Sequence, residues 1–264
     1  MLFRSPTSGS RGLTAAELAV AVAELREQVA GSIVLDAALV HPGEDVLLVL
    51  ARDDRKHFVH IALGSKRARI TTTARRFARH ERLSGPKALA LRTRLEGRTL
   101  EQVAVPAPGE RRARFSFSEG LRLEVELFSA RGLWALVDGA GRILDLSRPV
   151  ATAVRTLHLG EAYAPPPPSP EGAAGTEVPP RFAAPVLEAI DAHFAPMDAA
   201  AAAAADRELL RLAAARAVAR LQQKVEGLRT QLAESSRIDA LRQEADLLLA
   251  YAHAVPREIG RAHV

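Results

Sequence analysis

Residues 109–128, GERRARFSFSEGLRLEVELF, decide how the chain folds. Apolar and polar side chains alternate on both sides of the turn formed by Ser118, Glu119 and Gly120, which predicts a β-hairpin. One face of the hairpin carries the apolar row Phe115, Phe117, Leu121, Leu123, Val125 and Leu127. The other face carries Arg112, Arg114, Arg122, Glu124 and Glu126. We expect this charged face to be covered by water or by a partner.

The composition narrows the class of protein. With 264 residues, of which 48% are hydrophobic, the chain is long enough for one globular domain and an appendage. It has no cysteine, which excludes disulfides, thiolate metal sites and cysteine nucleophiles. There is no run of about eighteen apolar residues, and the first residues do not resemble a secretory signal. We therefore expect a cytoplasmic protein with no membrane partner.

The positive charge is concentrated in one segment. Residues 51–100 hold fourteen Lys and Arg against four Asp and Glu, an excess of +10, whereas the rest of the chain sums to −5. This asymmetry predicts a polyanion partner and a phosphate-binding surface. A genome rich in G and C could also raise the arginine content with no partner involved. The cations predicted to bind RNA or phosphate are Lys66, Arg67, Arg69, Arg75, Arg76, Arg79 and Arg92.

Residues 1–163 are predicted to form an α+β domain. Thr14 and Glu17 form a capping box for a helix that ends at Gly31, and a second helix begins at Pro86 and stops at Gly97. Besides the hairpin, strands are expected near 33–40, 46–51, 58–63, 68–71, 100–105, 133–137 and 143–146. Many short antiparallel strands with two helices indicate two packed sheets with flanking helices.

A proline-rich linker, 164–181, is predicted to connect this domain to a helical arm at 182–257. A short helix at 186–194 should end before Pro196, and Asp198 should cap the next helix. That helix carries the heptad positions Ala214, Val218, Leu221, Val225, Leu228 and Leu232. A polar break at 234–236 precedes a second helix, so we predict an antiparallel coiled-coil hairpin.

No catalytic constellation is apparent. His57 and His60 lie three residues apart in a predicted strand and therefore face opposite sides, which argues against a shared metal. We expect no enzymatic activity, no cofactor, no metal and no small-molecule substrate. The pair Glu110 and Arg111 stands on the loop before the hairpin and, from composition alone, is an ordinary exposed ion pair.

Several segments in the same order resemble the NFACT family, also called fibronectin-binding protein A-like. ELREQVAGSIV (24–34), ALRTRLEGRTLEQV (90–103) and ERRARFSF (110–117) are similar to the family's first helix, second helix and DR-x-x-x-F-x-F strand. RTLHLGEAYAPPPP (155–168) resembles the end of the family's first domain, and ADLLLAYAHAVPR (245–257) the end of its coiled-coil arm. The resemblance covers residues 11–163 and 182–256.

The resemblance implies a factor that binds tRNA and the large ribosomal subunit in the quality control of stalled nascent chains. Bacterial members extend such chains with alanine. Glu110 and Arg111 occupy the positions of the family's Asp-Arg pair, which implies a role in tRNA handling. The longer acid and the absence of the family's helix-hairpin-helix module, where the proline-rich linker stands, bear on alanine tailing more than on RNA binding.

The resemblance also bears on the end of the chain. The family continues into a C-terminal RNA-binding domain, so we expect a sequence truncated before it. Residues 258–264, EIGRAHV, match what a sequencing adapter encodes and are expected to be a non-native tail. Two other functions stay open: a coiled-coil adaptor that has lost tRNA handling, and a surface fibronectin-binding adhesin, as the older family label suggests.

Overall fold

The computed structural model describes residues 11–41, 44–64, 66–127, 132–167, 181–252 and 254. The chain divides into two compact units, 1–205 and 206–264, and each is considered by itself. The predicted tail at 258–264 and most of the predicted linker, 168–180, lie outside the described residues.

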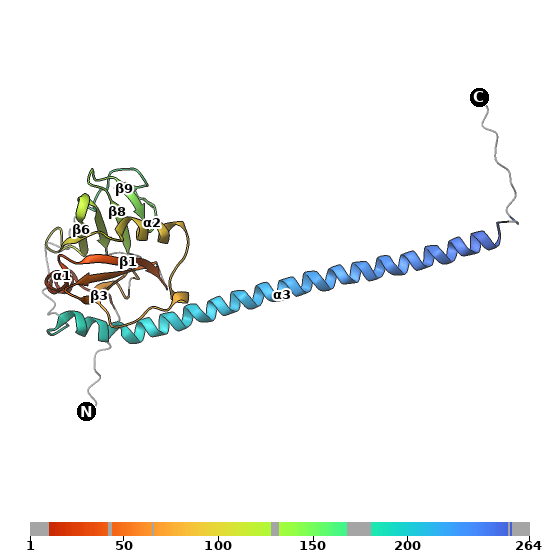
Figure 1. Cartoon of the computed structure of the whole chain (residues 1–264), viewed down its shortest axis with the longest axis horizontal. Coiled ribbons are helices and arrows are strands. Elements are labelled where there is room, and N and C mark those ends of the chain that lie inside the picture. Colours follow the sequence, from red (N-terminus) through yellow and green to blue (C-terminus); the bar gives the residue numbers. More distant parts are fainter. Residues whose placement is uncertain are drawn as a thin grey trace, which may run out of the picture. The chain divides into compact units, whose positions relative to one another are not determined.

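Two antiparallel sheets form the first unit, as predicted (Figure 1). The first sheet contains β1 (Ile33–Val40), β2 (Asp45–Arg52), β3 (Arg55–Ala62) and β4 (Arg69–Thr72). The second contains β5 (Leu100–Ala104), β6 (Arg112–Phe117), β7 (Arg122–Glu126), β8 (Leu133–Val137) and β9 (Ile143–Leu146). Each is a meander, because every strand pairs with the next one in the sequence. A separate two-stranded ribbon pairs β10 (Val150–Ala151) with β11 (Thr156–Leu157).

The β6–β7 hairpin forms around the predicted turn. Phe115 lies opposite Leu123, and the short 3-10 turn η2 (Ser118–Gly120) joins the strands. Glu119 and Gly120 have φ angles of 61° and 73°, in the left-handed region that glycine adopts without strain. The turn residues therefore set the register that directs the phenylalanines inward.

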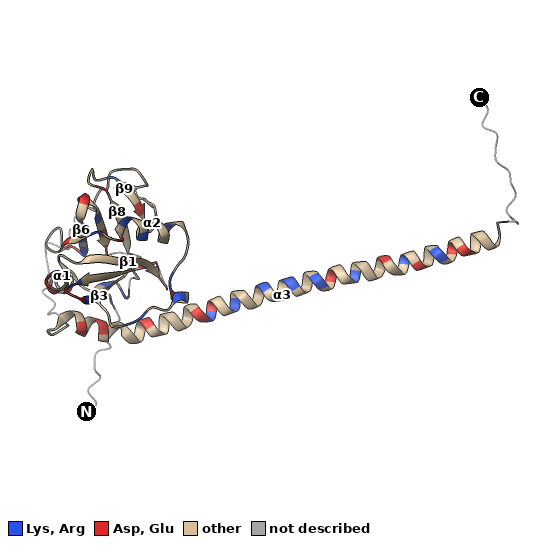
Figure 2. Cartoon of the chain, in the orientation of Figure 1, with Lys and Arg blue, Asp and Glu red and all other residues tan. Residues whose placement is uncertain are grey.

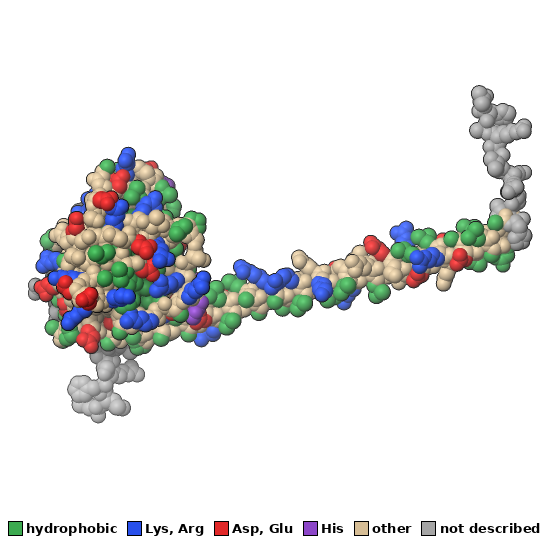
Figure 3. All heavy atoms as spheres, viewed as in Figure 1, with side chains coloured by type: hydrophobic (Ala, Val, Ile, Leu, Met, Phe, Trp, Pro, Cys, Tyr) green, Lys and Arg blue, Asp and Glu red, His purple; other side chains and the backbone are tan. Residues whose placement is uncertain are grey.

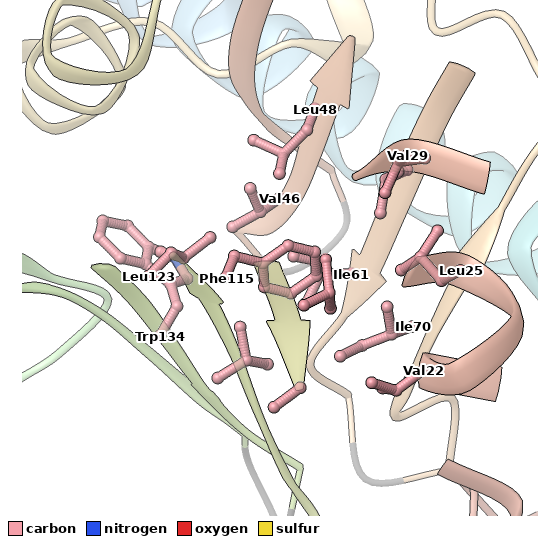
Figure 4. Packing of buried hydrophobic residues seen from close by; sticks show 14 of the residues in the cluster. Val22, Leu25, Val29, Val46, Leu48, Ile61, Ile70, Phe115, Leu123 and Trp134 are labelled. Carbon is pink, nitrogen blue, oxygen red and sulfur yellow. The ribbon is translucent and has the colours of Figure 1, made fainter. Parts of the chain in front are cut away.

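Helices border both sheets at their edge strands. The helix α1 (Ala15–Val29) contacts β4 and β5, while α2 (Pro86–Leu95), which follows the 3-10 turn η1 (Arg79–Glu81), contacts β1 and β9. Val22 and Leu25 of α1 meet Ile61 of the first sheet and Phe115 of the second in one core (Figure 4). Each such buried side chain stabilises the fold by about 1.5–3 kcal/mol.

Three of the five residues on the charged face of the hairpin are buried, so this part of the face is not covered by water. Arg112, Glu124 and Glu126 are 6%, 1% and 2% exposed. Arg155, which precedes β11, donates hydrogen bonds to both oxygens of Glu126, and the Tyr163 hydroxyl donates to the same carboxylate. Side chains from the segment that follows the sheet therefore contact this face, which alternation along β6 and β7 could not reveal.

The beginning of α3 (Val186–Ala250) packs on the sheets within the first unit. Ile190 and Phe194 are fully buried, and the Glu24 carboxylate of α1 accepts hydrogen bonds from the backbone N–H groups of Val186 and Leu187. These bonds satisfy donors that have no partner at the start of a helix. The predicted interruption before Pro196 does not occur, because α3 continues through it.

From residue 206 onward α3 stays helical, and the turn predicted at 234–236 is absent. The Ser236 hydroxyl donates to the Leu232 carbonyl at 3.1 Å, a bond that accommodates serine within a helix. Figure 2 shows both charge signs spread along this segment. Heptad residues such as Leu221 and Leu228 are 62% and 54% exposed, and they have no partner helix among the described residues. No helix in the described part of the chain is long and apolar enough to cross a membrane.

Candidate nucleic-acid interface

Arg111 immediately precedes β6, and its backbone is fixed by the sheet. Its carbonyl oxygen accepts a hydrogen bond of 2.8 Å from the N–H of Leu127. Side chains alternate along an extended segment, so Arg111 lies on the side of the core residues Ala113 and Phe115. Arg112 lies on the opposite side, with the charged residues of β7.

Glu110 binds Arg112 and not Arg111, which corrects the expected ion pair. Its Oε2 atom lies 2.6 Å from Nε and 2.5 Å from Nη2 of Arg112. Burial by itself lowers the pKa of Arg112, but its hydrogen bonds with Glu110 and Tyr163 outweigh burial and raise it. Glu110 therefore holds the loop to the charged face of the sheet, and its expected role in tRNA handling stays a prediction.

Arg111 is left without a partner among the described residues. Its Nε atom is buried and has no hydrogen-bond acceptor. Burial lowers the pKa of Arg111, the positive charge of Arg11 lowers it further, and the negative charge of Glu17 acts in the opposite direction. A guanidinium in this situation is available to an anion, because it presents planar donors that match phosphate geometry.

The nearby carboxylate of Glu17 is bound by Arg181. Oε1 of Glu17 lies 2.7 Å from Arg181 Nε, and Oε2 lies 3.0 Å from Arg181 Nη2. The Thr14 backbone N–H also donates to Oε2, at 2.8 Å, which completes the predicted capping box. Burial by itself would raise the pKa of Glu17, but the bonds from Arg181 and Thr14 outweigh it and lower the pKa to about 2.

This lowered pKa predicts a pH-dependent loss of stability. Glu17 has a folded-state pKa of about 2 against an ordinary value of 4.5, so its contribution is complete above pH 4.5 and is lost as the pH falls toward 2. The contribution is roughly 3 kcal/mol. Urea unfolding at several pH values should therefore show a shallower acid dependence for Glu17→Gln than for the wild type. Glu27→Gln, which changes an exposed glutamate on the same helix, should keep the wild-type dependence.

Arg67 and Arg69 are not part of a phosphate-binding surface, and that prediction is wrong. Arg69 is fully buried, and both arginines donate to Asp198 of α3, Arg67 at 2.8 Å. Arg67 also lies 3.2 Å from Asp45, which His60 faces at 3.5 Å. Burial by itself would raise the pKa of Asp45, but His60 and Arg67 hold it below its usual range. These residues form a buried ionic cluster that joins the first sheet to α3.

The other predicted cations have different environments. Arg75 pairs with Glu81, and Arg92 lies 3.1 Å from Glu96. Figure 3 shows acidic side chains interspersed with basic ones on the visible face of the domain. Of the predicted cations, Lys66, Arg76 and Arg79 are exposed and make no ion pair with a described residue. The guanidinium of Arg76 lies 3.8 Å from the centre of the Phe58 ring.

Arg79 and Arg92 come together in one open groove. This groove has a volume of about 840 Å³ and lies between η1, α2 and β1. Arg82 lies 2.7 Å and Arg92 lies 3.4 Å from the carboxylate of Asp36, which holds both cations at the groove wall. No group of His, Asp or Glu in the described ranges is arranged to hold a metal ion.

Sequence reasoning missed Arg181 and Arg112 as parts of this site. The capping box of Glu17 was predictable, but its ion pair with Arg181 spans 164 residues and has no local signal. Arg112 was assigned to the charged face, but its pairing joins the first residue of β6 to Glu110 in the preceding loop, and composition does not show this.

Residues 14–177 match the family of NFACT N-terminal and middle domains. The chain belongs to this family. No curated protein matches the sequence. The fold resembles the N-terminal domain of fibronectin-binding protein PavA from Streptococcus pneumoniae, with a TM-score of 0.53 and 19% identity over 60% of this chain and 66% of that chain. It also resembles the N-terminal part of the fibronectin/fibrinogen-binding protein from Streptococcus suis, with a TM-score of 0.53 and 20% identity over 60% of this chain and 62% of that one.

The family match and the two solved structures cover different properties of the chain. The family match covers the two sheets, α1 and α2, and therefore includes Glu110 and Arg111. At identities of 19% and 20% the two solved domains show a shared fold. The chain spans 66% and 62% of their lengths.

Proposed function

We propose that this NFACT protein is a cytoplasmic, non-enzymatic factor that binds tRNA and the large ribosomal subunit in the rescue of stalled nascent chains. The observation that carries the proposal is Arg111: a rigid strand entrance presents a guanidinium with no partner among the described residues. In the family, the arginine at this position belongs to the Asp-Arg pair tied to tRNA handling.

The exposed cations support a second set of contacts with the RNA backbone. Lys66, Arg76 and Arg79 face solvent, and Arg82 and Arg92 line the groove beside Arg79. Phosphate contacts of this kind give affinity without sequence specificity. In this proposal Arg111 contacts one defined position of the tRNA, and the exposed cations add affinity through other phosphates.

Salt dependence tests this division of roles. The logarithm of the tRNA association constant should fall linearly with the logarithm of salt concentration, with a slope of about 0.7–0.9 per phosphate contacted. Replacing Lys66, Arg76 and Arg79 together with alanine should make the slope shallower, whereas Arg67 is buried in an ion pair and is not expected to contribute. An unchanged slope in filter binding would place the RNA contacts elsewhere.

The adaptor function has its own supporting observation, which is the exposed apolar row on α3 that includes Val218 and Leu221. The two solved relatives are named for binding fibronectin or fibrinogen. The same preparation should therefore be tested for sedimentation with large ribosomal subunits and for binding to immobilised fibronectin. Failure to bind tRNA or subunits at low salt would favour the adaptor, and saturable fibronectin binding without RNA binding would favour the adhesin.

A further inference from the structure

The unpaired state of Arg111 requires an explanation, because a carboxylate lies within its electrostatic reach. Glu17 lies in the first turn of α1, and its negative charge acts to raise the pKa of Arg111. Glu17 is 2% exposed, so water does not satisfy it. A buried glutamate near an arginine would ordinarily form a charge-assisted pair with it.

Arg181 prevents that pairing by using the acceptor positions of Glu17. Its Nε and Nη2 atoms bind the two carboxylate oxygens at 2.7 and 3.0 Å, and its backbone N–H lies 3.3 Å from Oε1. The Thr14 N–H binds Oε2 at 2.8 Å. Each oxygen of Glu17 therefore already accepts two hydrogen bonds, which matches its two lone pairs.

Arg181 is itself held by backbone carbonyl groups just before α1. Its Nη2 atom donates to the Gly12 carbonyl at 3.1 Å, and Nη1 donates to the Arg11 carbonyl at 3.4 Å. Its guanidinium also lies 5.0 Å from the centre of the Phe182 ring. These contacts hold the Arg181 guanidinium in an orientation in which it donates hydrogen bonds to both oxygens of one carboxylate.

We infer that Arg181 is a positioning residue that occupies Glu17 and thereby keeps Arg111 free for a phosphate of the bound RNA. This inference rests on the proposed function, since it concerns the same Arg111. Arg181 lies after the proline-rich segment, so the availability of Arg111 depends on a residue outside the strands of the first domain. Without Arg181, we expect the Glu17 carboxylate to form an ion pair with Arg111 and so compete with RNA for its guanidinium.

Variants that remove the charge of Arg181 or Glu17 test the inference through their tRNA affinity. Arg181→Ala should weaken tRNA binding about as much as Arg111→Ala, by about ten- to a hundredfold, the range for a charge-assisted hydrogen bond. In Arg181→Ala combined with Glu17→Gln, no carboxylate remains to capture Arg111, so affinity should return toward that of the wild type. Circular dichroism should establish that each variant is folded at the temperature of the binding measurement.

The double variant separates positioning from direct contact. If Arg181 touched RNA itself, Glu17→Gln would not restore affinity, and that result would overturn the inference. Wild-type affinity in Arg181→Ala, together with weakened binding in Arg111→Ala, would also overturn it while leaving the proposed function intact. Wild-type affinity in Arg111→Ala would instead overturn the proposed function, and with it the inference.

Discussion

Asp198→Ala is expected to lower the free energy of unfolding by about 3–5 kcal/mol, the usual cost of removing one partner from a buried ion pair. Asp198 is 4% exposed and binds both Arg67 and Arg69. After the substitution Arg69 would keep no hydrogen bond to a carboxylate among the described residues, and its remaining acceptors would be the Arg67 carbonyl at 3.1 Å and the His60 ring nitrogen at 3.1 Å. Burial already lowers the pKa of Arg69, which shows that its charge is poorly solvated.

Urea unfolding followed by circular dichroism measures this effect. Asp206→Ala is the matched control, since Asp206 is exposed on the same helix and should change stability by about 0.5 kcal/mol or less. Equal, small effects of the two substitutions would mean that the start of α3 is not anchored by Arg67 and Arg69.

Glu126→Ala is expected to have a similar cost, about 3–5 kcal/mol, for a different part of the domain. Its carboxylate accepts two hydrogen bonds from Arg155, at 3.0 and 2.6 Å, and one of 2.8 Å from the Tyr163 hydroxyl. The Arg155 side chain is 9% exposed, so without this carboxylate its charge would be buried and would lose its ion-pair partner. Tyr163→Phe removes the hydrogen bonds of the hydroxyl with Glu126 and Arg112 but leaves the ion pair of Glu126 with Arg155, so it should cost less, about 1–3 kcal/mol.

Thermal or urea unfolding can compare these variants with Glu161→Ala, which changes an exposed glutamate close to Tyr163 in the sequence. That control should be nearly neutral. A neutral Glu126→Ala would contradict the view that residues 155–164 are fastened to the second sheet through this carboxylate.

The sequence predicted the features of the fold that depend on local patterns. Alternation of Phe115 and Phe117 with charged residues identified β6, and Thr14 with Glu17 identified the start of α1. The break between two helices predicted at 234–236 does not occur, because serine alone does not stop a helix. The Ser236 hydroxyl bonds to the carbonyl one turn before it. No glycine or proline stands at 234–236 to end the helix.

The environment of each arginine could not be predicted in the same way. Arg67 and Arg69 have the composition of a phosphate-binding patch, but their partner Asp198 lies 129 residues beyond Arg69. Glu110 and Arg111 are adjacent, yet adjacent residues of an extended segment point to opposite sides, so Glu110 binds Arg112. Charge density along the sequence thus indicated a basic region and could not separate buried cations from available ones.

The tRNA dissociation constant of Arg111→Ala, with unfolding measured on the same sample, shows whether Arg111 is available to RNA. Arg142→Ala is the control, because Arg142 is 64% exposed and pairs with Asp138 at 3.4 Å. We expect Arg111→Ala to weaken tRNA binding by about ten- to a hundredfold while Arg142→Ala does not. The stability of Arg111→Ala should be unchanged or higher, since an unpaired, partly buried charge is removed. Undiminished tRNA affinity together with a destabilised fold would contradict the account.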